Sequence, residues 1–400
     1  MMILCTTPDE RLEMVLMEAK DLGLRTVFCG EQMHEPTREA AHAFYLSDWN
    51  DTEELIRIGR REQISGIIGL CDKAMIPVAA VSEALDLPGS PSESMRKLLS
   101  KRSFRLLQEE AGVFCPRSAV AESPKEMERS LADLRFPVII KPMLASSSHG
   151  MTVLQNAEGI EEAFAEASAE SRNGAVCIEE YIPNDSLRII EADVFVVGDD
   201  ILWDGVRYCY RVENAPLRPV YDVYPVHLTT SEWEEFRRTV SRVLQCAGAV
   251  LGEYNVEGFF TPQGQFFIVE INPRQAGHYN PQDIERFCGV NLTRLLITTA
   301  VGDMSYYEEL KDFRRTCNIV LSYSIFSERE GILDHIHMDP GLKSRLVKFR
   351  YLHGQKEGDP VLDIRHAIRP IAKAVFVFDT EDELEAVRRQ ITQLVFPILR

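Results

Sequence analysis

The sequence predicts a mixed α/β and α+β fold in several domains, and three observations carry this prediction. Near the N-terminus, short apolar segments alternate with segments of helical periodicity, which is the pattern of a parallel sheet covered by helices. Further along, apolar segments follow one another across turn residues, as antiparallel strands do. The length of 400 residues is enough for two or three domains with cores of their own.

The first domain is expected over residues 1–95. Thr7 and Pro8 suit the N-cap and first position of a helix that ends at Gly23. Strands are expected at residues 2–6, 24–29 and 64–70, and a second helix at residues 52–61. The first strand-to-helix turn lacks GxGxxG, so a dinucleotide site is not expected there. Asp72 follows the third strand and is expected to cap the next helix, with contact to a ligand as the alternative.

A central domain is expected over residues 96–303, with a smaller subdomain at about 115–185. The segment Ser90-Pro91-Ser92-Glu93 predicts a helix start just before it. Lys101 lies between this helix and the next one and, taken alone, is expected to be solvated. A capping box at Ser123-Pro124-Lys125-Glu126 predicts the first helix of the subdomain.

A run of small residues joins two strands of the subdomain. Lys141 ends the first of them, and Ala145–Gly150 leads to the second. Small residues and a glycine let backbone N–H groups turn toward an anion, so this segment predicts a phosphate-covering loop, with an ordinary polar loop as the alternative. Pro183 leaves backbone groups at the end of a later strand free for a planar heterocycle. These elements are expected at residues 136–140, 151–154, 157–170 and 175–183.

The rest of the central domain is expected to be mainly antiparallel. Arg207, Arg211 and Arg218 lie close together in the sequence of an acidic protein, which suggests recognition of a carboxylate or phosphate, although surface arginines are common. Ser231 is expected to cap a long helix that ends near Gly248. Antiparallel strands are expected at residues 192–227, and one further helix at residues 281–301.

One hairpin, at residues 255–274, carries most of the expected chemistry. Side chains alternate along a strand and opposed residues share a face, so a loop of two or four residues places Glu257, Glu270 and Asn272 together. Two carboxylates and an amide on one face of an apolar hairpin predict a Mg²⁺ site, with a polar outer face as the alternative. Arg274 beside such a cluster is suited to clamp an anion.

The tail over residues 304–400 is expected to form an α+β domain, a lid packed beside the hairpin face. Strands are expected at residues 318–325 and 374–378, followed by a capping box at Thr380–Glu383. Arg350, within a basic and aromatic segment, is expected to contribute to substrate selection. A dimerisation or purely structural module is the alternative.

Charge and composition argue against several classes of function. The net charge of −18 argues against a nucleic-acid partner, which would require a basic surface. Nine cysteines without CxxC spacing indicate reduced thiols of the cytoplasm. The first residues lack the features of a signal peptide, and no segment has the length of a membrane span. A cytoplasmic protein without nucleic-acid or membrane partners is expected, and a homodimer remains open.

Five segments in register resemble the ATP-grasp superfamily. They are Lys141-Pro142, the serine-rich loop that ends at Gly150, Glu179-Glu180-Tyr181-Ile182, Glu257, and Glu270-Ile271-Asn272-Pro273-Arg274. The resemblance covers about residues 1–303, and within the superfamily the chain looks most like carboxylate–amine ligases related to bacilysin-type L-amino-acid ligases. It implies an ATP-grasp fold with an N-terminal Rossmann-like parallel α/β domain, central ATP-grasp subdomains and a C-terminal α+β lid.

The resemblance also implies how ATP would be bound. Lys101 and Lys141 would hold its phosphates under a loop that consists of Ser146, Ser147, Ser148, His149 and Gly150. Glu179 would meet the adenine amino group, while the Glu180 carbonyl and the Ile182 N–H, on either side of Tyr181, would contact the adenine edge. Glu191 is expected to hold the ribose, with Asp185 as the alternative. His149 and the single glycine depart from the commoner glycine-rich loop, which predicts slower closure.

The same resemblance implies a ligase. Glu257, Glu270 and Asn272 would bind two Mg²⁺, or Mn²⁺ in their place, and Arg274 and Lys141 would be catalytic. Phosphoryl transfer from ATP to a carboxylate, expected to be an amino acid, would give an acyl phosphate that a small-molecule amine attacks. The alternatives are a carboxylase that acts through carboxyphosphate and a silent ATP-binding protein. The silent protein is disfavoured because Lys141 and the three metal ligands are all present.

Overall fold

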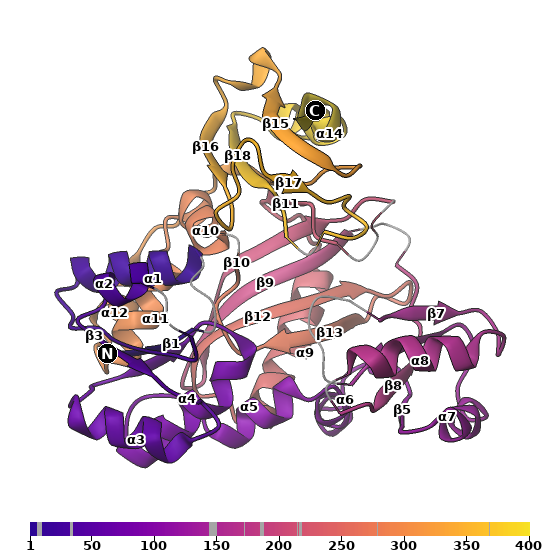
Figure 1. The fold of residues 1–400 in the computed structure, drawn as a ribbon, viewed down its shortest axis with the longest axis horizontal. Helices are drawn as coiled ribbons and strands as arrows, with labels where there is room; N and C mark the ends of the chain where they lie inside the picture. The colour runs from indigo at the N-terminus through magenta and orange to yellow at the C-terminus, as the bar shows by residue number, and fades with distance from the viewer. Residues whose placement is uncertain are drawn as a thin grey trace.

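One large antiparallel sheet forms the middle of the molecule, with smaller regions around it (Figure 1). The computed structural model describes residues 1–5, 10–32, 35–143, 150–171, 173–184, 188–213, 215, 218–277, 279–367 and 369–400. None of the helices in these ranges is long and apolar enough to cross a membrane.

The N-terminal region is a four-stranded parallel sheet in the order β3-β2-β1-β4. Its strands are β1 (Met2–Leu4), β2 (Val27–Gly30), β3 (Ala43–Leu46) and β4 (Ile67–Gly69), and its helices are α1 (Glu10–Asp21), α2 (Glu35–Ala40), α3 (Thr52–Arg61) and α4 (Asp72–Leu85). Separate apolar clusters lie on its two faces, as expected of a parallel sheet, so the predicted α/β arrangement is confirmed. The cap expected at Thr7 and Pro8 lies outside the described residues.

The connection into the central region corrects the cap expected at Ser90. Two helices follow each other there, α5 (Ser92–Leu99) and α6 (Lys101–Glu110). Glu83 accepts hydrogen bonds from the peptide N–H and the hydroxyl of Ser92, each at 2.9 Å, so it satisfies the start of α5. The Ser90 hydroxyl oxygen instead accepts from the N–H of Val250 at 2.9 Å. Ser90 therefore connects the N-terminal region to the large sheet.

A small antiparallel sheet in the order β5-β8-β6-β7 forms the region at the lower right of Figure 1. Its elements are β5 (Ser118–Ala121), α7 (Pro124–Leu131), β6 (Val138–Pro142), β7 (Thr152–Leu154), α8 (Ile160–Glu170) and β8 (Val176–Glu180). The Ser123 side chain accepts from the N–H of Glu126, as predicted. The Glu126 carboxylate accepts from the N–H of Glu122, one residue before the predicted partner. The two helices cover one face over a core of their own.

The large sheet has the strand order β13-β12-β9-β10-β11-β14-β18-β16. Its strands in chain order are β9 (Arg188–Val197), β10 (Asp200–Tyr210), β11 (Tyr221–Tyr224), β12 (Leu251–Phe260), β13 (Phe266–Asn272), β14 (Ile319–Ile325), β16 (Leu346–Tyr351) and β18 (Ala372–Phe378). Polar side chains gather on one face of β9, β10 and β12, because alternate residues of a strand share a face. The opposite face belongs to the largest apolar cluster.

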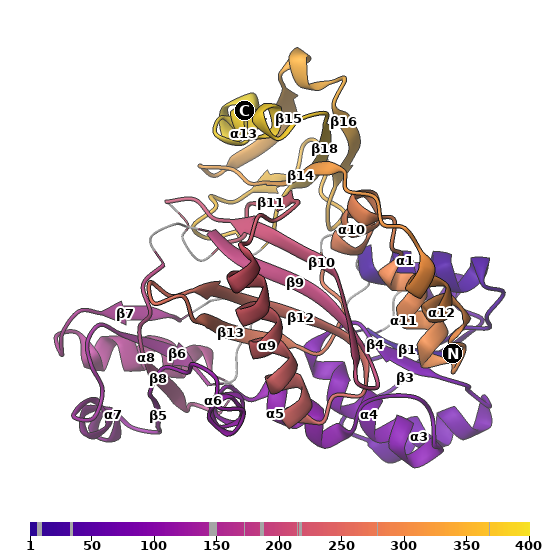
Figure 2. The ribbon, with the colours of Figure 1, turned by 180° about the vertical axis from the view of Figure 1, so that it is seen from behind.

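Helices cover both faces of this sheet (Figures 1 and 2). They are α9 (Thr230–Ala247) on the apolar face, and α10 (Asn280–Cys288), α11 (Leu292–Ala300) and α12 (Ser305–Asp312) on the other side. Thr229, and not Ser231, caps α9, in a capping box with Glu232. The single helix expected at residues 281–301 is two helices, because Gly289 has a φ of 83° and Asn291 caps the second one.

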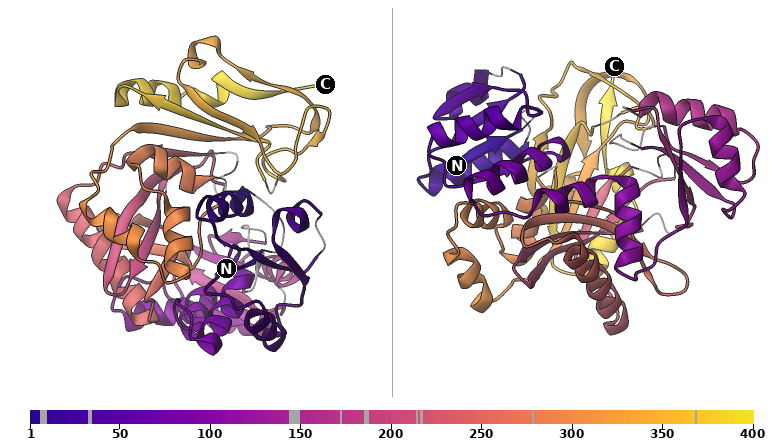
Figure 3. Two further views of the ribbon diagram at one scale, coloured as in Figure 1. Left: turned by 90° about the vertical axis from the view of Figure 1, so that its left-hand side faces the viewer. Right: turned by 90° about the horizontal axis from the view of Figure 1, so that it is seen from below.

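The tail continues the large sheet at the edge opposite the hairpin, so the expectation that it packs beside the hairpin face is wrong. β14 pairs with β11, and β18 and β16 follow. The remaining elements are β15 (Gly331–Met338), a 3₁₀ turn (Pro340–Leu342), β17 (Pro360–Val361), α13 (Glu381–Arg388), α14 (Ile391–Leu394) and β19 (Val395–Leu399). In the left view of Figure 3 this region stands above both the N-terminal region and the large sheet.

Candidate active site

The hairpin of β12 and β13 places Glu257 directly opposite Glu270. Phe260 pairs with Phe266, so the loop has five residues instead of the two or four that were expected. A bulge between Glu257 and Gly258 compensates for the odd number and restores the shared face. The predicted grouping of the carboxylates is therefore present, although the turn that produces it is different.

Asn272 completes this group of oxygen atoms. Its side-chain nitrogen donates a hydrogen bond to Glu270 Oε1 at 2.9 Å. Asn255, which pairs with Asn272 across the hairpin, turns instead to Asp193 and donates to its Oδ1 at 3.0 Å. Two carboxylates and an amide oxygen are the donor set that Mg²⁺ accepts, so the residues present fit this ion.

The electrostatics of Glu257 point to a missing positive charge. The pKa of Glu257 is raised to about 8, mainly by burial and then by the negative charges of Glu270 and of Glu191, its partner on β9. The positive charges of Arg211 and Arg274 lower it by less. Arg211 lies 3.7 Å from the Glu257 carboxylate, and 22% of the Glu257 side chain is exposed to solvent. A divalent cation between Glu257 and Glu270 would remove this repulsion.

Lys141 and Glu179 form a buried ion pair that also includes Arg105. Lys141 Nζ lies 2.5 Å from Glu179 Oε2, and the Arg105 guanidinium donates to both Glu179 oxygens at 3.0 and 3.2 Å. Burial alone would raise the pKa of Glu179, but the charges of Lys141 and Arg105 hold it well below its usual range. Glu179 was expected to meet adenine; here its two oxygens are already bonded to cations.

Arg105 was not singled out in the sequence, and its position on α6 could have indicated it. It stands one helical turn after Lys101, at i and i+4, so both side chains leave the same face of the helix. Burial lowers the pKa of Lys101, while the negative charge of Glu270 opposes this and the positive charge of Lys141 adds to it. Lys101 thus interacts electrostatically with both Lys141 and Glu270, so the two lysines lie close to the hairpin carboxylates.

The segment expected to read adenine lies at the end of β8. The strand ends at Glu180, whose carboxylate is bound by Arg117 at 2.8 Å, and the N–H of Tyr181 donates to the Pro137 carbonyl at 2.8 Å. The Glu180 carbonyl and the Ile182 N–H therefore lie at the point where the pairing of β8 with its neighbouring strands ends. Ser146, Ser147, Ser148 and His149 lie outside the described residues, as does Asp185. Gly150 is described, with a φ of 64° that glycine adopts without strain.

Glu191, expected to hold the ribose, is one of three carboxylates around Arg207. Arg207 is fully buried, at 2.6 Å from Glu191, 2.7 Å from Asp193 and 3.6 Å from Asp222. The expectation that Arg207 recognises a ligand is wrong, because its guanidinium is enclosed by the protein's own carboxylates. Burial raises the pKa of Asp222 to about 6 despite this cation.

The other two arginines of this segment also have partners in the protein. Arg218 Nε donates to the Ile364 carbonyl at 2.8 Å and connects the central region to the tail. Arg211 turns toward Glu257, as described above. Glu191, Cys209 and Asp222 hold metal-ligating atoms within 4.8 Å of one another, but the Arg207 guanidinium already supplies the cation there.

Arg274 contacts the N-terminal region through Asp72. Arg274 Nε donates to Asp72 Oδ1 at 2.9 Å, with 17% of the arginine side chain exposed. Asp72 is the first residue of α4, and Cys71 holds the N-cap position, so the expected capping role is wrong. The alternative, contact of Asp72 with a ligand, stays a prediction. The ion pair holds Arg274 at the end of β13, next to the hairpin carboxylates.

Two family models match parts of this chain. The family model "Carbamoyl-phosphate synthase L chain, ATP binding domain" matches residues 100–303, and the model "ATP-grasp N-terminal domain" matches residues 16–89. The formate-dependent phosphoribosylglycinamide formyltransferase of Haloquadratum walsbyi is 27% identical over 268 residues, which are 65% of this chain and 64% of that protein. The chain spans 57% to 66% of the length of the curated relatives that it matches.

Two solved structures share the fold over essentially the whole chain. The L-amino acid ligase from Bacillus licheniformis has a TM-score of 0.82 at 17% identity and covers 100% of this chain and 98% of its own. The phosphoribosylglycinamide synthetase from Anaerococcus prevotii has a TM-score of 0.75 at 19% identity, with 100% and 99% covered. At these identities the likeness is one of fold.

Proposed function

The chain belongs to the ATP-grasp family of the carbamoyl-phosphate synthase L chain ATP-binding domain, and on this premise we propose that it is an ATP-dependent carbon–nitrogen ligase. It would activate a carboxylate as an acyl phosphate and join it to an amine, releasing ADP and phosphate. The observation that carries the proposal is the pairing of Glu257 with Glu270 beside Asn272, close to two lysines and Arg274.

In this proposal Glu257, Glu270 and Asn272 hold Mg²⁺, with Mn²⁺ able to replace it. The ion, when bound, would neutralise charge on the phosphates of ATP. The raised pKa of Glu257 supports such a site, because a cation between the two carboxylates offsets their repulsion. Two ions are proposed, since the paired carboxylates offer four oxygen atoms in addition to the amide.

The positive side chains have complementary roles in the proposed reaction. Lys101 and Lys141 hold the phosphates of ATP, with Lys141 released in part from Glu179 as the phosphates arrive. Arg274 orients the carboxylate substrate and then the acyl phosphate. A carboxylate resists attack by an amine because oxide is a poor leaving group, whereas phosphate leaves readily. The chain needs no nucleophile of its own, because the work is positioning and charge neutralisation.

The nucleotide would lie between the small sheet and the large one. The Glu180 carbonyl and the Ile182 N–H are proposed to contact adenine at the end of β8, and the loop over residues 146–150 to cover the phosphates. Glu191 is less suited to the ribose than sequence suggested, because Arg207 already binds its carboxylate. Asp185 is therefore the proposed ribose ligand.

We also propose a cytoplasmic location, which the state of the thiols supports. All nine cysteines are unpaired, and Cys5, Cys29, Cys177, Cys209 and Cys288 are buried. Free thiols persist in a reducing compartment.

The test is to incubate the protein with ATP, Mg²⁺ and pairs of amino acids and to measure phosphate release and product mass. Phosphate release that requires a carboxylate and an amine, with a new amide in the product, is the expected result. ADP formation that depends on bicarbonate alone would identify the carboxylase alternative. ATP binding without turnover for any carboxylate tested would contradict the ligase.

A further inference from the structure

Glu253 has a buried carboxylate oxygen without a hydrogen-bond partner among the described residues. The residue is 2% exposed, and its Oε2 accepts from Gln275 Nε2 at 2.8 Å, whereas its Oε1 has no partner there. A buried carboxylate oxygen without a partner is costly, so a donor group placed beside it would stabilise the protein.

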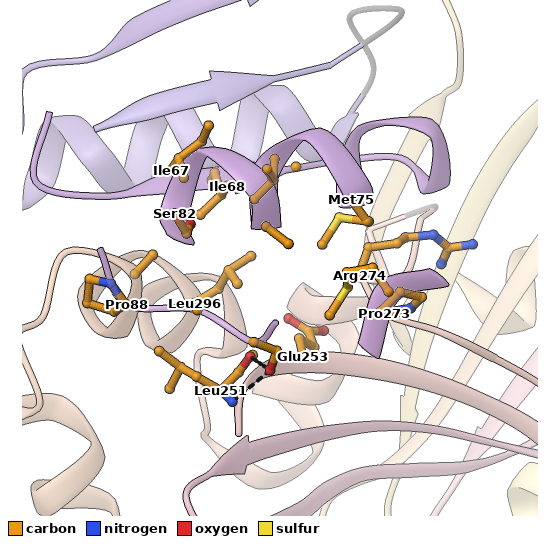
Figure 4. A pocket seen from close by; sticks show the side chains of 18 of the residues that line it. Ile67, Ile68, Met75, Ser82, Pro88, Leu251, Glu253, Pro273, Arg274 and Leu296 are labelled. Atoms are coloured by element: carbon orange, nitrogen blue, oxygen red, sulfur yellow. Dashed lines mark hydrogen bonds between the residues drawn. The ribbon is translucent and has the colours of Figure 1, made fainter. Parts of the chain in front are cut away.

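The space beside Glu253 is a cavity of about 70 Å³ beneath α4, between the start of β12 and α11. In Figure 4 the Glu253 carboxylate points toward the part of this space between Met75 and Leu296. Most of the wall is apolar, and it includes Ile68, Val78 and Leu251 besides these two residues. One buried water needs about 10–15 Å³ on this scale, so the cavity has room for about five groups of that size.

Three polar side chains that border the cavity have other partners. The hydroxyl of Ser90 donates to a backbone carbonyl at 2.9 Å, and the hydroxyl of Thr299 donates to another at 2.8 Å. The Arg274 guanidinium donates to Asp72 and is turned away from the cavity (Figure 4). These side chains therefore leave Glu253 Oε1 to a donor from outside the protein.

The charge around Glu253 is also unbalanced. Burial, and then the negative charge of Asp193, raise the pKa of Glu253 well above its usual range. The hydrogen bond from Gln275 and the positive charges of Arg207 and Arg274 lower it by less. A positively charged ligand would favour the ionised carboxylate. A primary ammonium group carries such a charge and also donates hydrogen bonds.

The walls of the cavity are held in place by contacts that do not depend on a ligand. Gln275 is fully buried and accepts from the hydroxyl of Thr293 at 3.3 Å, which fixes the amide that holds Glu253. A Cβ at Gly69 would come within 2.9 Å of Met75 Sδ, so glycine at this position lets Met75 line the cavity. The cavity is therefore a formed feature of the fold.

We propose that this cavity binds a small primary alkylammonium ion, with its ammonium group at Glu253 Oε1 and an apolar chain of about four carbons against the wall under α4. Glu253 and Glu257 both lie on β12, about 13 Å apart at about 3.3 Å per residue, so this site is separate from the proposed metal site. The bound ion would stabilise the contact between the N-terminal region and the large sheet, because both contribute to the wall. The inference does not depend on the proposed function.

Two ligands of similar shape test the proposal. Isobutylamine carries an ammonium group at pH 8, since the pKa of a primary amine such as the lysine side chain is about 10.4, whereas isobutanol is neutral. The affinity for each follows from the rise in melting temperature with ligand concentration. Wild-type protein should bind isobutylamine at least about tenfold more tightly, the effect of one buried charge-assisted hydrogen bond. Equal affinity for the two ligands, or no binding of isobutylamine, would overturn the proposal.

The variant Glu253→Gln keeps the shape of the side chain and removes its charge. It should lose the preference for isobutylamine over isobutanol. Folding is not threatened, because the change removes a buried negative charge. Glu234→Gln is the matched control, since Glu234 is an exposed residue of α9, on the opposite face of the sheet, and should keep the wild-type ratio. An unchanged ratio in Glu253→Gln would contradict the assignment.

A second variant tests the apolar part of the cavity. Val78→Phe adds about four carbon atoms under α4, so it should weaken isobutylamine binding by at least about tenfold. Its melting curve without ligand shows whether it is folded, and Glu253→Gln tests the site independently. Isobutylamine bound to folded Val78→Phe as tightly as to the wild type would show that the cavity is not the site.

The same variants separate this inference from the proposed ligase. Glu253-dependent binding of isobutylamine by a protein that forms no ADP with any substrate pair would support the cavity site and contradict the ligase. Amide formation by a protein that binds isobutylamine and isobutanol equally would do the reverse.

Discussion

Glu270 is the residue whose charge should matter most, because it faces Glu257 across the hairpin and accepts a hydrogen bond from Asn272. Glu270→Gln keeps the size and the hydrogen bond but removes one negative charge from the proposed metal site. ADP formation should fall by about 100-fold or more, which is typical for loss of one electrostatic group in an active site. Turnover near the wild-type value at saturating Mg²⁺ would contradict the metal assignment.

The pKa of Glu257 predicts how Mg²⁺ binding depends on pH. Because the pKa is raised to about 8, most Glu257 is protonated at neutral pH without metal, and Mg²⁺ binding must displace the proton. Mg²⁺ affinity should therefore increase from pH 6 to pH 8 and level off above it. Titration calorimetry in buffers of different ionisation enthalpy would detect the released proton. Glu257→Gln should bind Mg²⁺ weakly and with no such increase.

The same shift affects stability in the metal-free protein. A carboxyl group with a raised pKa in the folded state contributes stability that is fully present below its unfolded pKa of about 4.5 and is lost as the pH rises through about 8. The melting temperature without metal should thus decrease over this range, and Mg²⁺ should reduce the decrease. A melting temperature that rises between pH 5 and pH 8 without metal would contradict the shift.

Helix α6 connects two other elements, because its Arg105 reaches Glu179 on β8 and the Ile268 and Val269 carbonyls of β13. Arg105→Leu would leave Glu179 buried with Lys141 alone, and loss of one member of a buried ion pair costs about 3–5 kcal/mol. The free energy of unfolding from urea melts should fall by that amount. Arg102→Leu, on the exposed side of the same helix, should change it by less than about 0.5 kcal/mol.

Several elements could be predicted from sequence because local residue patterns determine them. The alternation of apolar segments with helical segments predicts the parallel sheet. The alternation of side chains along a strand predicts that Glu257, Glu270 and Asn272 share one face. The bulge that makes this possible could not be predicted, because an extra residue in a strand leaves no local pattern. Arg207 could not be assigned either, since its partners Glu191 and Asp222 become neighbours only when β9, β10 and β11 pair. The lack of a hydrogen-bond partner for buried Glu253 Oε1 among the described residues could not be predicted either, because it depends on packing between distant segments.

At the scale of the whole molecule, Arg350 lies where three regions meet. Its guanidinium stacks over the Tyr279 ring at 4.1 Å and lies 3.5 Å from Glu13 of α1. We expect Arg350→Ala to raise the KM of the amine substrate and leave the KM of ATP unchanged. The reason is that Tyr279 directly precedes α10, far from the small sheet beside which ATP is proposed to bind (Figure 1). Steady-state kinetics with each substrate varied in turn would measure this.

Arg345→Ala is the control for this prediction. Arg345 pairs with Asp379 and Glu383 inside the tail, so its loss removes a similar charge without touching Tyr279. Both KM values should stay at the wild-type level. A wild-type KM for every amine in Arg350→Ala would contradict a role of the tail in substrate selection.

The pairing of β11 with β14 also has a consequence for how the protein is made. Tyr221 pairs with Tyr323 and Val223 with Leu321, so β11 has no neighbour on that side until the tail has left the ribosome. An unpaired strand edge can join another chain, and pairings between distant segments form slowly. The yield of soluble protein should therefore improve at lower growth temperature or with chaperones. A chain ended at residue 303 should aggregate rather than persist as a smaller enzyme.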